Sequence, residues 1–171
     1  INYTTSGAMG VTHLIAEIFA NEAGVEWTHI PEKGSGPAVT ALLGGHVELS
    51  SAAIGPAMAH VRAGTLRALA VFSDKRLKAF PDVPTLKELG YKVEARALYG
   101  ILAPKDTPKP VVDAIFLAAK KAGEKYQLQI SDSLSSLGAQ IALLDPKEYA
   151  EYVADQKAMF TKAKQTLKLS D

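Results

Sequence analysis

The stretch TTSGAMGVTH, residues 4–13, carries side chains that could hold a ligand near the start of the chain. It places the hydroxyls of Thr5 and Ser6 beside Gly7 and Gly10, between a strand-like and a helix-like segment. Free backbone N–H groups at a helix start, with the positive end of the helix dipole, attract an anion. Glycines let the backbone approach that anion, and hydroxyls add donors. The spacing is equally compatible with a simple capped helix after a tight turn.

Two further loops of small residues follow predicted strands. The loop PEKGSGP, residues 31–37, offers a positive charge at Lys33 and close backbone approach at Gly34 and Ser35. The loop SSAAIGP covers residues 50–56. Ligands of open parallel sheets collect outside the carboxyl ends of strands. Three such loops along one edge favour a ligand cleft over helix capping alone.

Other chemistries find little support in the sequence. The spacings of a phosphate loop and of a dinucleotide-binding loop are absent, and Ser6 is not part of a G-x-S-x-G elbow. His13, His29, His46 and His60 fall in different predicted elements at no metal-ligand spacing. A single histidine on a helix, such as His13, is more often structural than a ligand contact. We therefore expect no catalytic residue, no metal and no cofactor.

Composition narrows the classes of partner. The chain has 19 basic and 18 acidic residues, a net charge of +1 and no basic run, so we expect no nucleic-acid partner. It has no cysteine, which excludes disulfides and thiolate metal sites. No apolar segment reaches the roughly 18 residues of a membrane span. The chain opens at Ile1 within an apparent strand and without a signal peptide, which indicates a processed chain, a domain or a fragment.

The first half alternates between strand and helix patterns. Leu14, Ile15, Ile18 and Phe19 recur on one helical face, and Gly24 follows as a stop. This alternation predicts βαβ units, a mainly parallel sheet and an α/β fold. The expected strands are residues 1–4, 26–30, 46–50 and 66–73, and the expected helices are residues 9–23, 37–43 and 56–63.

The second half is less regular. The sequence DPKE at residues 145–148 has the features of a capping box, which predicts a helix start. A helix before it carries Val111, Val112, Ile115 and Phe116 on one face. The expected strands are residues 93–104 and 139–144, and the expected helices are residues 108–124 and 145–167.

Several segments together resemble the Bug-type receptors, the periplasmic solute-binding proteins of tripartite tricarboxylate transporters. The segment YTTSGAMGVTHLIAEIFANEAGVEWTHIPEKGSGPAVTALLGGHVEL is similar to the family's Ser-Gly loop, its helix with an early His-Leu, its VPYKG loop and its ALLGGHVD helix exit. The segments VRAGTLRALAVFSDKR, FPDVPTLKELGY, YGILAPKDTPKPVVDAI and DPKEYAEYVADQ continue the similarity toward the end of the chain. Together these motifs are specific, whereas any one alone is weak.

The resemblance implies a two-lobed, type II periplasmic-binding-protein fold without catalytic activity. Such a receptor closes over a small organic anion, such as a di- or tricarboxylate, an amino acid or an aromatic acid. It is periplasmic and delivers the anion to the membrane components of its transporter. The ligand-binding residues that the resemblance implies are Thr5, Ser6, Gly7, Ala8 and Gly10 of the first loop, and Lys33, Gly34 and Ser35 of the second.

The chain departs from the family pattern in two ways. Glu32 replaces the tyrosine of the family's PYKG segment, and we expect its carboxylate to point to solvent because it would repel an anion. The N-terminal lobe of the family also has no counterpart. Residues 1–96 would then form the complete second lobe, and residues 97–171 a return segment that completes the first.

The lack of a first lobe would expose the apolar helix at residues 108–124. We expect a second copy to cover it, as a homo-oligomer or as a dimer that exchanges its tails. Two alternatives to the receptor stay open. One is an α/β enzyme that uses the Ser6 loop as an anion or oxyanion site, and the other is a non-catalytic oligomerisation or sensing domain.

Overall fold

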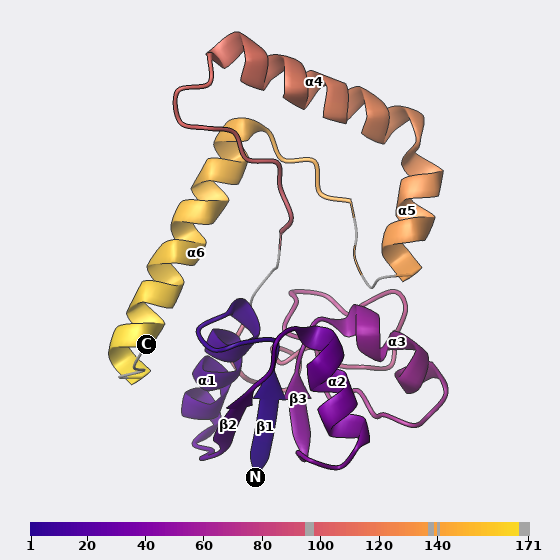
Figure 1. Ribbon diagram of the computed structural model, residues 1–171, viewed down its shortest axis with the longest axis vertical. Helices are drawn as coiled ribbons and strands as arrows, with labels where there is room; N and C mark the ends of the chain where they lie inside the picture. Colours follow the sequence, from indigo (N-terminus) through magenta and orange to yellow (C-terminus); the bar gives the residue numbers. More distant parts are fainter. Residues whose placement is uncertain (95–97, 137–138, 140, 168–171) are drawn as a thin grey trace.

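A three-stranded parallel sheet forms the centre of the first half of the molecule. The computed structural model describes residues 1–94, 98–136, 139 and 141–167. The strand order is β2-β1-β3 (Figure 1). Each strand ends one residue later than the sequence pattern predicts. The strands are β1 (Asn2–Thr5), β2 (Thr28–Pro31) and β3 (Leu49–Ser51).

Each strand leads into a helix. The three helices agree with the predicted ones to within two residues at each end. Because β2 and β3 lie on opposite sides of β1, right-handed crossovers place the first two helices on opposite faces of the sheet. The central strand is consequently buried from Tyr3 to Thr5. The helices are α1 (Val11–Ala23), α2 (Ser35–Leu43) and α3 (Ile54–Arg62).

The fourth predicted strand, residues 66–73, is wrong. Val71 makes one isolated parallel bridge with Thr85, and its N–H donates to Pro84 O over 2.9 Å. A strand requires a continuous ladder of backbone hydrogen bonds with a neighbour, and this segment has a partner at one point only. Its apolar side chains Ala70 and Phe72 nevertheless pack against the core formed by Ile15, Leu86 and Val93.

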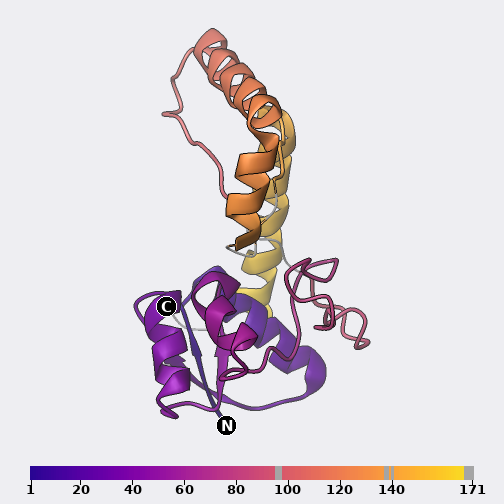
Figure 2. The same cartoon turned by 90° about the vertical axis from the view of Figure 1, so that its right-hand side faces the viewer.

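Three helices make up most of the second half. They are α4 (Lys109–Lys125), α5 (Gln127–Ser136) and α6 (Pro146–Leu167). The predicted helices at 108–124 and 145–167 are confirmed to within one residue, whereas α5 was not predicted because its sequence is polar. Figure 2 shows α4 far from the sheet, with α6 leading back toward it. Near the end of α6, Phe160 packs against the core beside α1.

The two strands predicted in this half are also wrong where the structure describes them. Residues 93–94, 98–104, 139 and 141–144 form no strand, and residues 95–97 and 140 lie outside the described part. An extended segment becomes a strand only when another strand satisfies its backbone groups. Much of the first segment is solvent-exposed, with Tyr99 at 89% and Leu102 at 82%.

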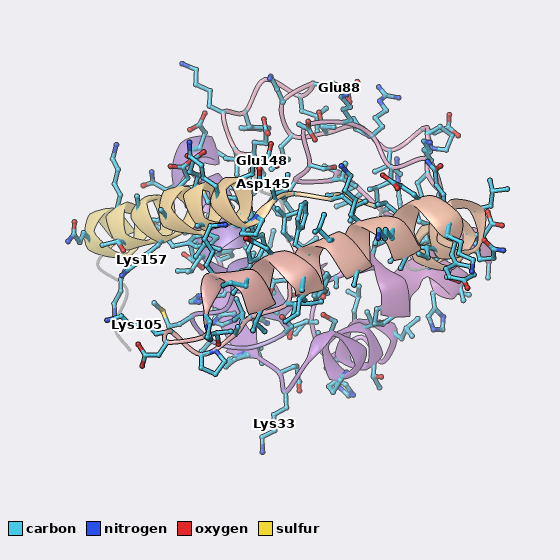
Figure 3. The ribbon with its side chains drawn as sticks, turned by 90° about the horizontal axis from the view of Figure 1, so that it is seen from above. Lys33, Glu88, Lys105, Asp145, Glu148 and Lys157 are labelled. Atoms are coloured by element: carbon cyan, nitrogen blue, oxygen red, sulfur yellow. The ribbon has the colours of Figure 1, made fainter. Side chains whose placement is uncertain are left out.

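The predicted capping box at the start of α6 is confirmed. The Asp145 carboxylate accepts hydrogen bonds from the N–H groups of Lys147 (2.7 Å) and Glu148 (2.9 Å), and Asp145 N donates to Glu148 Oε2 over 2.8 Å. Figure 3 shows the two acidic side chains next to each other at this helix start. The cap fixes where α6 begins and so where Phe160 meets the core.

We expect Asp145→Ala to lower the free energy of unfolding by about 1 kcal/mol, because it removes the acceptor shared by two N–H groups. Chemical denaturation measures the loss. Asp155→Ala changes an exposed acidic residue inside α6 and is the control, which should cost nothing because alanine favours helix interiors. Equal losses in the two variants would contradict this role of Asp145.

Candidate functional site

The carboxyl ends of all three strands meet at one edge of the sheet. In the strand register, Thr5 is the partner of Pro31 on β2 and of Ser51 on β3. The loops that follow these residues lead directly into α1, α2 and α3. The three small-residue loops recognised in the sequence therefore lie together, as the topology of a parallel sheet predicts.

Hydrogen bonds join these loops to one another. Gly34 N donates to Ser6 O over 3.0 Å, which links the second loop to the first. Ala53 N donates to Ser35 Oγ over 3.2 Å, which links the third loop to the start of α2. The Ser51 hydroxyl donates to Thr12 O on α1 over 2.8 Å. Backbone groups and serine hydroxyls thus connect the three loops at this edge.

None of the three helices in residues 1–94 begins with a side-chain cap. The N-cap residues are Gly10 for α1, Gly34 for α2 and Ala53 for α3, and none makes a side-chain hydrogen bond to its helix. The first loop therefore lacks the side-chain cap of a simple capped helix, and its assignment as a ligand loop stays a prediction. Helix starts without side-chain caps leave backbone N–H groups that can receive an anion.

The first loop is held in shape by its own hydroxyl groups. Ser6 N and Ser6 Oγ both contact Thr12 Oγ1, at 3.3 and 2.8 Å. The Thr5 hydroxyl donates to Gly7 O over 3.1 Å and accepts from Gly7 N over 3.3 Å. The hydroxyls predicted as ligand donors are thus occupied in shaping the loop, and Ala8 at its tip is exposed.

The second loop depends on a backbone conformation that favours glycine. Gly34 has φ +117° and ψ 167°, a region that side-chain-bearing residues rarely adopt. The Lys33 side chain is exposed and extends away from the protein (Figure 3). The second loop therefore presents backbone groups to the sheet edge, with its positive charge on the outside.

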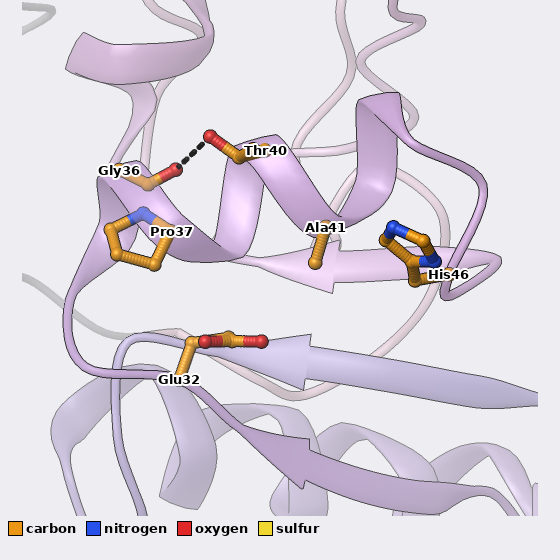
Figure 4. A pocket seen from close by; sticks show the side chains of 6 residues that line it. All are labelled: Glu32, Gly36, Pro37, Thr40, Ala41 and His46. Carbon is orange, nitrogen blue, oxygen red and sulfur yellow. Dashed lines mark hydrogen bonds between the residues drawn. The ribbon is translucent and has the colours of Figure 1, made fainter.

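Glu32 lies at an open groove on the surface, and the expectation that its carboxylate points to solvent stays a prediction. Its side chain is half-buried and lines an open groove of about 570 Å³ between β2 and α2 (Figure 4). Its backbone N–H donates to Thr5 O over 3.1 Å. The other lining residues are Gly36, Pro37, Thr40, Ala41 and His46, so the groove follows the side of α2 rather than the three loops.

Two stacked histidines lie beneath the first loop, a pair that the sequence analysis did not recognise. The rings of His13 and His29 have centroids 3.8 Å apart and planes inclined by 12°. His13 is 7% exposed, and its Nδ1 accepts from Met9 N over 3.1 Å. His29 Nε2 lies 2.8 Å from Thr5 Oγ1. Once the strands are aligned, the register between Tyr3 and His29 places this histidine beside β1.

Burial determines the protonation of this cluster. It lowers the pKa of His13, although the nearby Glu17 carboxylate opposes the shift. Burial and the neighbouring His13 lower the pKa of His29. Burial and a hydrogen bond from the Tyr3 hydroxyl to Glu17 raise the pKa of Tyr3 above its ordinary range. At neutral pH both imidazoles and the phenol are uncharged.

The described residues contain no group of three or more His, Asp or Glu side chains placed to hold a metal ion. Among the same residues, no helix is long and apolar enough to cross a membrane.

The sequence of the chain matches the family described as "Tripartite tricarboxylate transporter family receptor" over residues 1–169. The chain belongs to this family, TctC. The predicted resemblance to Bug-type receptors is therefore confirmed, and the family is one of solute-binding receptors.

Two curated relatives are similar to most of this TctC chain. The UPF0065 protein in the gbd 5'region of Cupriavidus necator is 37% identical over 156 residues, which are 91% of this chain and 46% of that protein. Protein BugT of Bordetella pertussis is 37% identical over 147 residues, covering 84% of this chain and 44% of that protein. The chain spans about half the length of the curated relatives it matches.

Solved structures show the same fold. "Structure of a periplasmic transporter" aligns with a TM-score of 0.84 at 34% identity, over 98% of this chain and 54% of that one. Rpa4515 of R. palustris with adipate aligns with a TM-score of 0.85 at 28% identity, over 98% of this chain and 56% of that one. MatC from Rhodopseudomonas palustris with bound malate aligns with a TM-score of 0.74 at 26% identity, again over 98% of this chain and 56% of that one. The predicted periplasmic-binding-protein fold is confirmed.

In this TctC chain we expect Gly34→Ala to lower the free energy of unfolding by about 1–3 kcal/mol, because a Cβ is strained at its φ and ψ. Gly36→Ala is the matched control, two residues further along and inside α2, where no atom lies within 4 Å of an added Cβ. It should raise stability by about 0.5–1 kcal/mol. Chemical denaturation compares the two. A stabilising Gly34→Ala would show that the second loop tolerates another conformation.

Proposed function

We propose that the chain is the ligand-binding part of an extracytoplasmic receptor that captures a small organic carboxylate for a tripartite tricarboxylate transporter. The observation that carries the proposal is the edge where three uncapped helices begin side by side. Backbone N–H groups at such an edge bind a carboxylate through charge-assisted hydrogen bonds. The related structures with adipate and malate, both dicarboxylates, support this ligand class.

The proposed contacts come mainly from backbone amides. Thr5 and Ser6 shape the first loop through their hydroxyls, while the amides of the loop tip and of the helix starts face the ligand. Lys33 contributes through its backbone or through long-range attraction, since its side chain extends outward. The proposed site consists of Thr5, Ser6, Gly7, Ala8, Gly10, Lys33, Gly34 and Ser35.

We propose residues 1–96 as the ligand-binding lobe and residues 97–171 as the segment that completes the other lobe. The boundary falls at residues that lie outside the described part. The periplasmic setting and the membrane partner are proposed from the family. A second lobe would supply the remaining contacts of the cleft, because binding proteins of this kind close around their ligands.

The geometry favours binding over catalysis. The Ser6 hydroxyl contacts Thr12 Oγ1, and His13 Nδ1 is occupied by Met9 N. A nucleophilic serine needs a base within hydrogen-bond reach of its hydroxyl. The Ser6 hydroxyl contacts another hydroxyl rather than a base, which supports a non-catalytic role for the loop.

The proposal predicts that adipate or malate raises the thermal midpoint of the chain. A ligand at about 100 times its dissociation constant adds roughly 2.7 kcal/mol to folded-state stability. Succinate, citrate, aspartate, glutamate and aromatic acids extend the screen to the whole proposed ligand class. Ala8→Asp should abolish the shift by placing a negative charge at the exposed loop tip, whereas the isosteric Ala8→Asn should keep it.

Adipamide, which lacks carboxylates, is the ligand control for the same experiment. No shift with any acid, or an equal shift with adipamide, would contradict the proposed function. A shift that persists in Ala8→Asp would place the carboxylate site elsewhere on the chain.

Self-association is a second proposal, carried by exposed apolar side chains. Ile101 is 73% exposed and Leu102 is 82% exposed, and α4 also exposes Val111, Ile115 and Leu117. Exposed apolar surface of this kind marks a site of protein–protein contact. In a longer receptor the other half would cover it, and in the 171-residue chain alone we propose that a second copy does so.

Light scattering should give the chain a mass of twice 18.2 kDa that falls on dilution. Leu102→Lys should shift it toward the monomer, whereas Leu43→Lys, an exposed change on α2, should not. A monomer at every concentration would contradict the self-association. A dimer whose mass and stability no carboxylate alters would favour the oligomerisation domain over the receptor.

A further inference from the structure

The stacked imidazoles of His13 and His29 hold the first loop at two points. On one side, His29 Nε2 lies 2.8 Å from Thr5 Oγ1, whose hydroxyl also donates to Gly7 O. On the other side, His13 Nδ1 accepts from Met9 N over 3.1 Å. Met9 has φ +57°, a left-handed conformation that a non-glycine residue keeps only when its surroundings hold it there.

The Met9 bond fixes the protonation of His13. A backbone N–H can only donate, so Nδ1 must present its lone pair, and the ring proton of the neutral imidazole is on Nε2. This Nε2 lies 3.9 Å from Glu17 Oε1. A second proton on Nδ1 would set a donor against the Met9 N–H. Protonation of His13 and the observed loop are therefore mutually exclusive.

Burial lowers the pKa of both rings and keeps them neutral, although the Glu17 carboxylate opposes the shift in each. Each ring lies within stacking distance of the other, so a charge on one disfavours a charge on its neighbour. The titratable groups that face the pair are Glu17 on α1 and Tyr3 on β1. Glu17 Oε1 accepts from the Tyr3 hydroxyl and from Trp27 Nε1. Two further elements packed here contribute side chains without charge: β3 contacts α1 through the Ser51 hydroxyl, and α6 contacts the core through Phe160.

We propose that His13 and His29 are positioning residues of the carboxylate-binding loop, and that protonation of His13 in acid releases the loop and weakens binding. The effect on ligand rests on the proposed receptor function, whereas the effect on the loop does not. An imidazolium beneath the loop would attract an anion, but it would also break the bond that holds Met9 and with it the arrangement of amides that binds the anion.

The direction of the pH dependence follows from the lowered histidine pKa values. The unfolded chain takes up these protons near pH 6.5, and the folded chain only at a lower pH. The stabilising contribution of the neutral pair is therefore complete above about pH 6.5 and is lost as the pH falls toward the pKa values of the folded state.

Nuclear magnetic resonance of the ligand-free chain tests the positioning role directly. The expected spectrum shows His13 with its proton on Nε2, and a Met9 amide signal that moves with the titration of His13 at a midpoint below 6.5. A proton on His13 Nδ1 at neutral pH, or a Met9 amide signal that does not change as His13 titrates, would overturn the proposal.

Two substitutions separate positioning from packing. His13→Asn places a side-chain oxygen near the position of Nδ1. This variant should keep the hydrogen bond from Met9 N, and the Met9 amide signal should no longer depend on pH. His13→Phe keeps the stacked ring but has no acceptor, so the Met9 amide should exchange faster with solvent at every pH. His60→Asn on α3 is the control outside the cluster. Equal behaviour of the Asn and Phe variants would reduce His13 to a packing residue.

Adipate binding, measured by calorimetry at pH 7.5 and 5.5, tests the link to the ligand. We expect the affinity of the unsubstituted chain and of His60→Asn to fall at least about fivefold in acid, the size of a modest coupling. In His13→Asn the change should be clearly smaller, and this variant also corrects for the titration of adipate itself. Equal pH dependence in all three proteins would overturn the link. If adipate fails to bind at pH 7.5, the proposed function fails, while the ligand-free spectra still decide the role of the pair.

Discussion

Parallel pairing of β1 with both neighbouring strands is the constraint on which the rest of this structure depends. Because all three strands run in the same direction, their carboxyl ends and the helix starts that follow lie at one edge. The backbone groups at this edge either join the loops, as Gly34 N and Ser6 O do, or remain available to a ligand. A site of this kind follows from topology and needs few specialised side chains.

The central strand also connects the site with the core. Alternate residues of β1 point to opposite faces, so Tyr3 and Thr5 both face α1. Tyr3 stacks on Trp27 at 4.3 Å between centroids and donates to Glu17, while Thr5 reaches His29 and Gly7. The loop is thus supported by side chains that are themselves part of the packed interior. A change in the protonation of that interior reaches the loop, because His13 and His29 contact the loop directly.

The sequence predicted those elements whose signals lie within their own residues. Helix α1 has a periodic apolar face with a glycine stop, and α6 has a capping box, so both could be placed from the sequence to within two residues. The strands predicted at residues 66–73 and 93–104 could not be judged in this way, because a strand forms only beside a partner strand and the sequence pattern of one segment does not identify its partner. The polar sequence of α5 likewise gave no helical signal.

The same distinction applies to the candidate site. Its loops could be recognised, since small residues after strands are visible in the sequence, and their assignment as ligand contacts stays a prediction. The stacked histidines could not be recognised, because their contact requires the register of β1 against β2 as well as the position of α1. His13 and His29 are 16 residues apart in the sequence, and no spacing rule joins them.

The distribution of charge around the loops is consistent with capture of an anion by neutral groups. The Lys33 side chain extends outward, the histidines beneath the loop are uncharged at neutral pH, and the Glu32 carboxylate lies in the groove beside α2. A fixed cation in the site would bind any anion strongly and release it slowly. Helix starts and amides instead supply partial charges with defined directions, so binding depends on how well the carboxylate fits them. Under the proposed function the ligand must also be released to a transporter. Binding that depends on geometry then has the advantage that it ends when the loops change their arrangement.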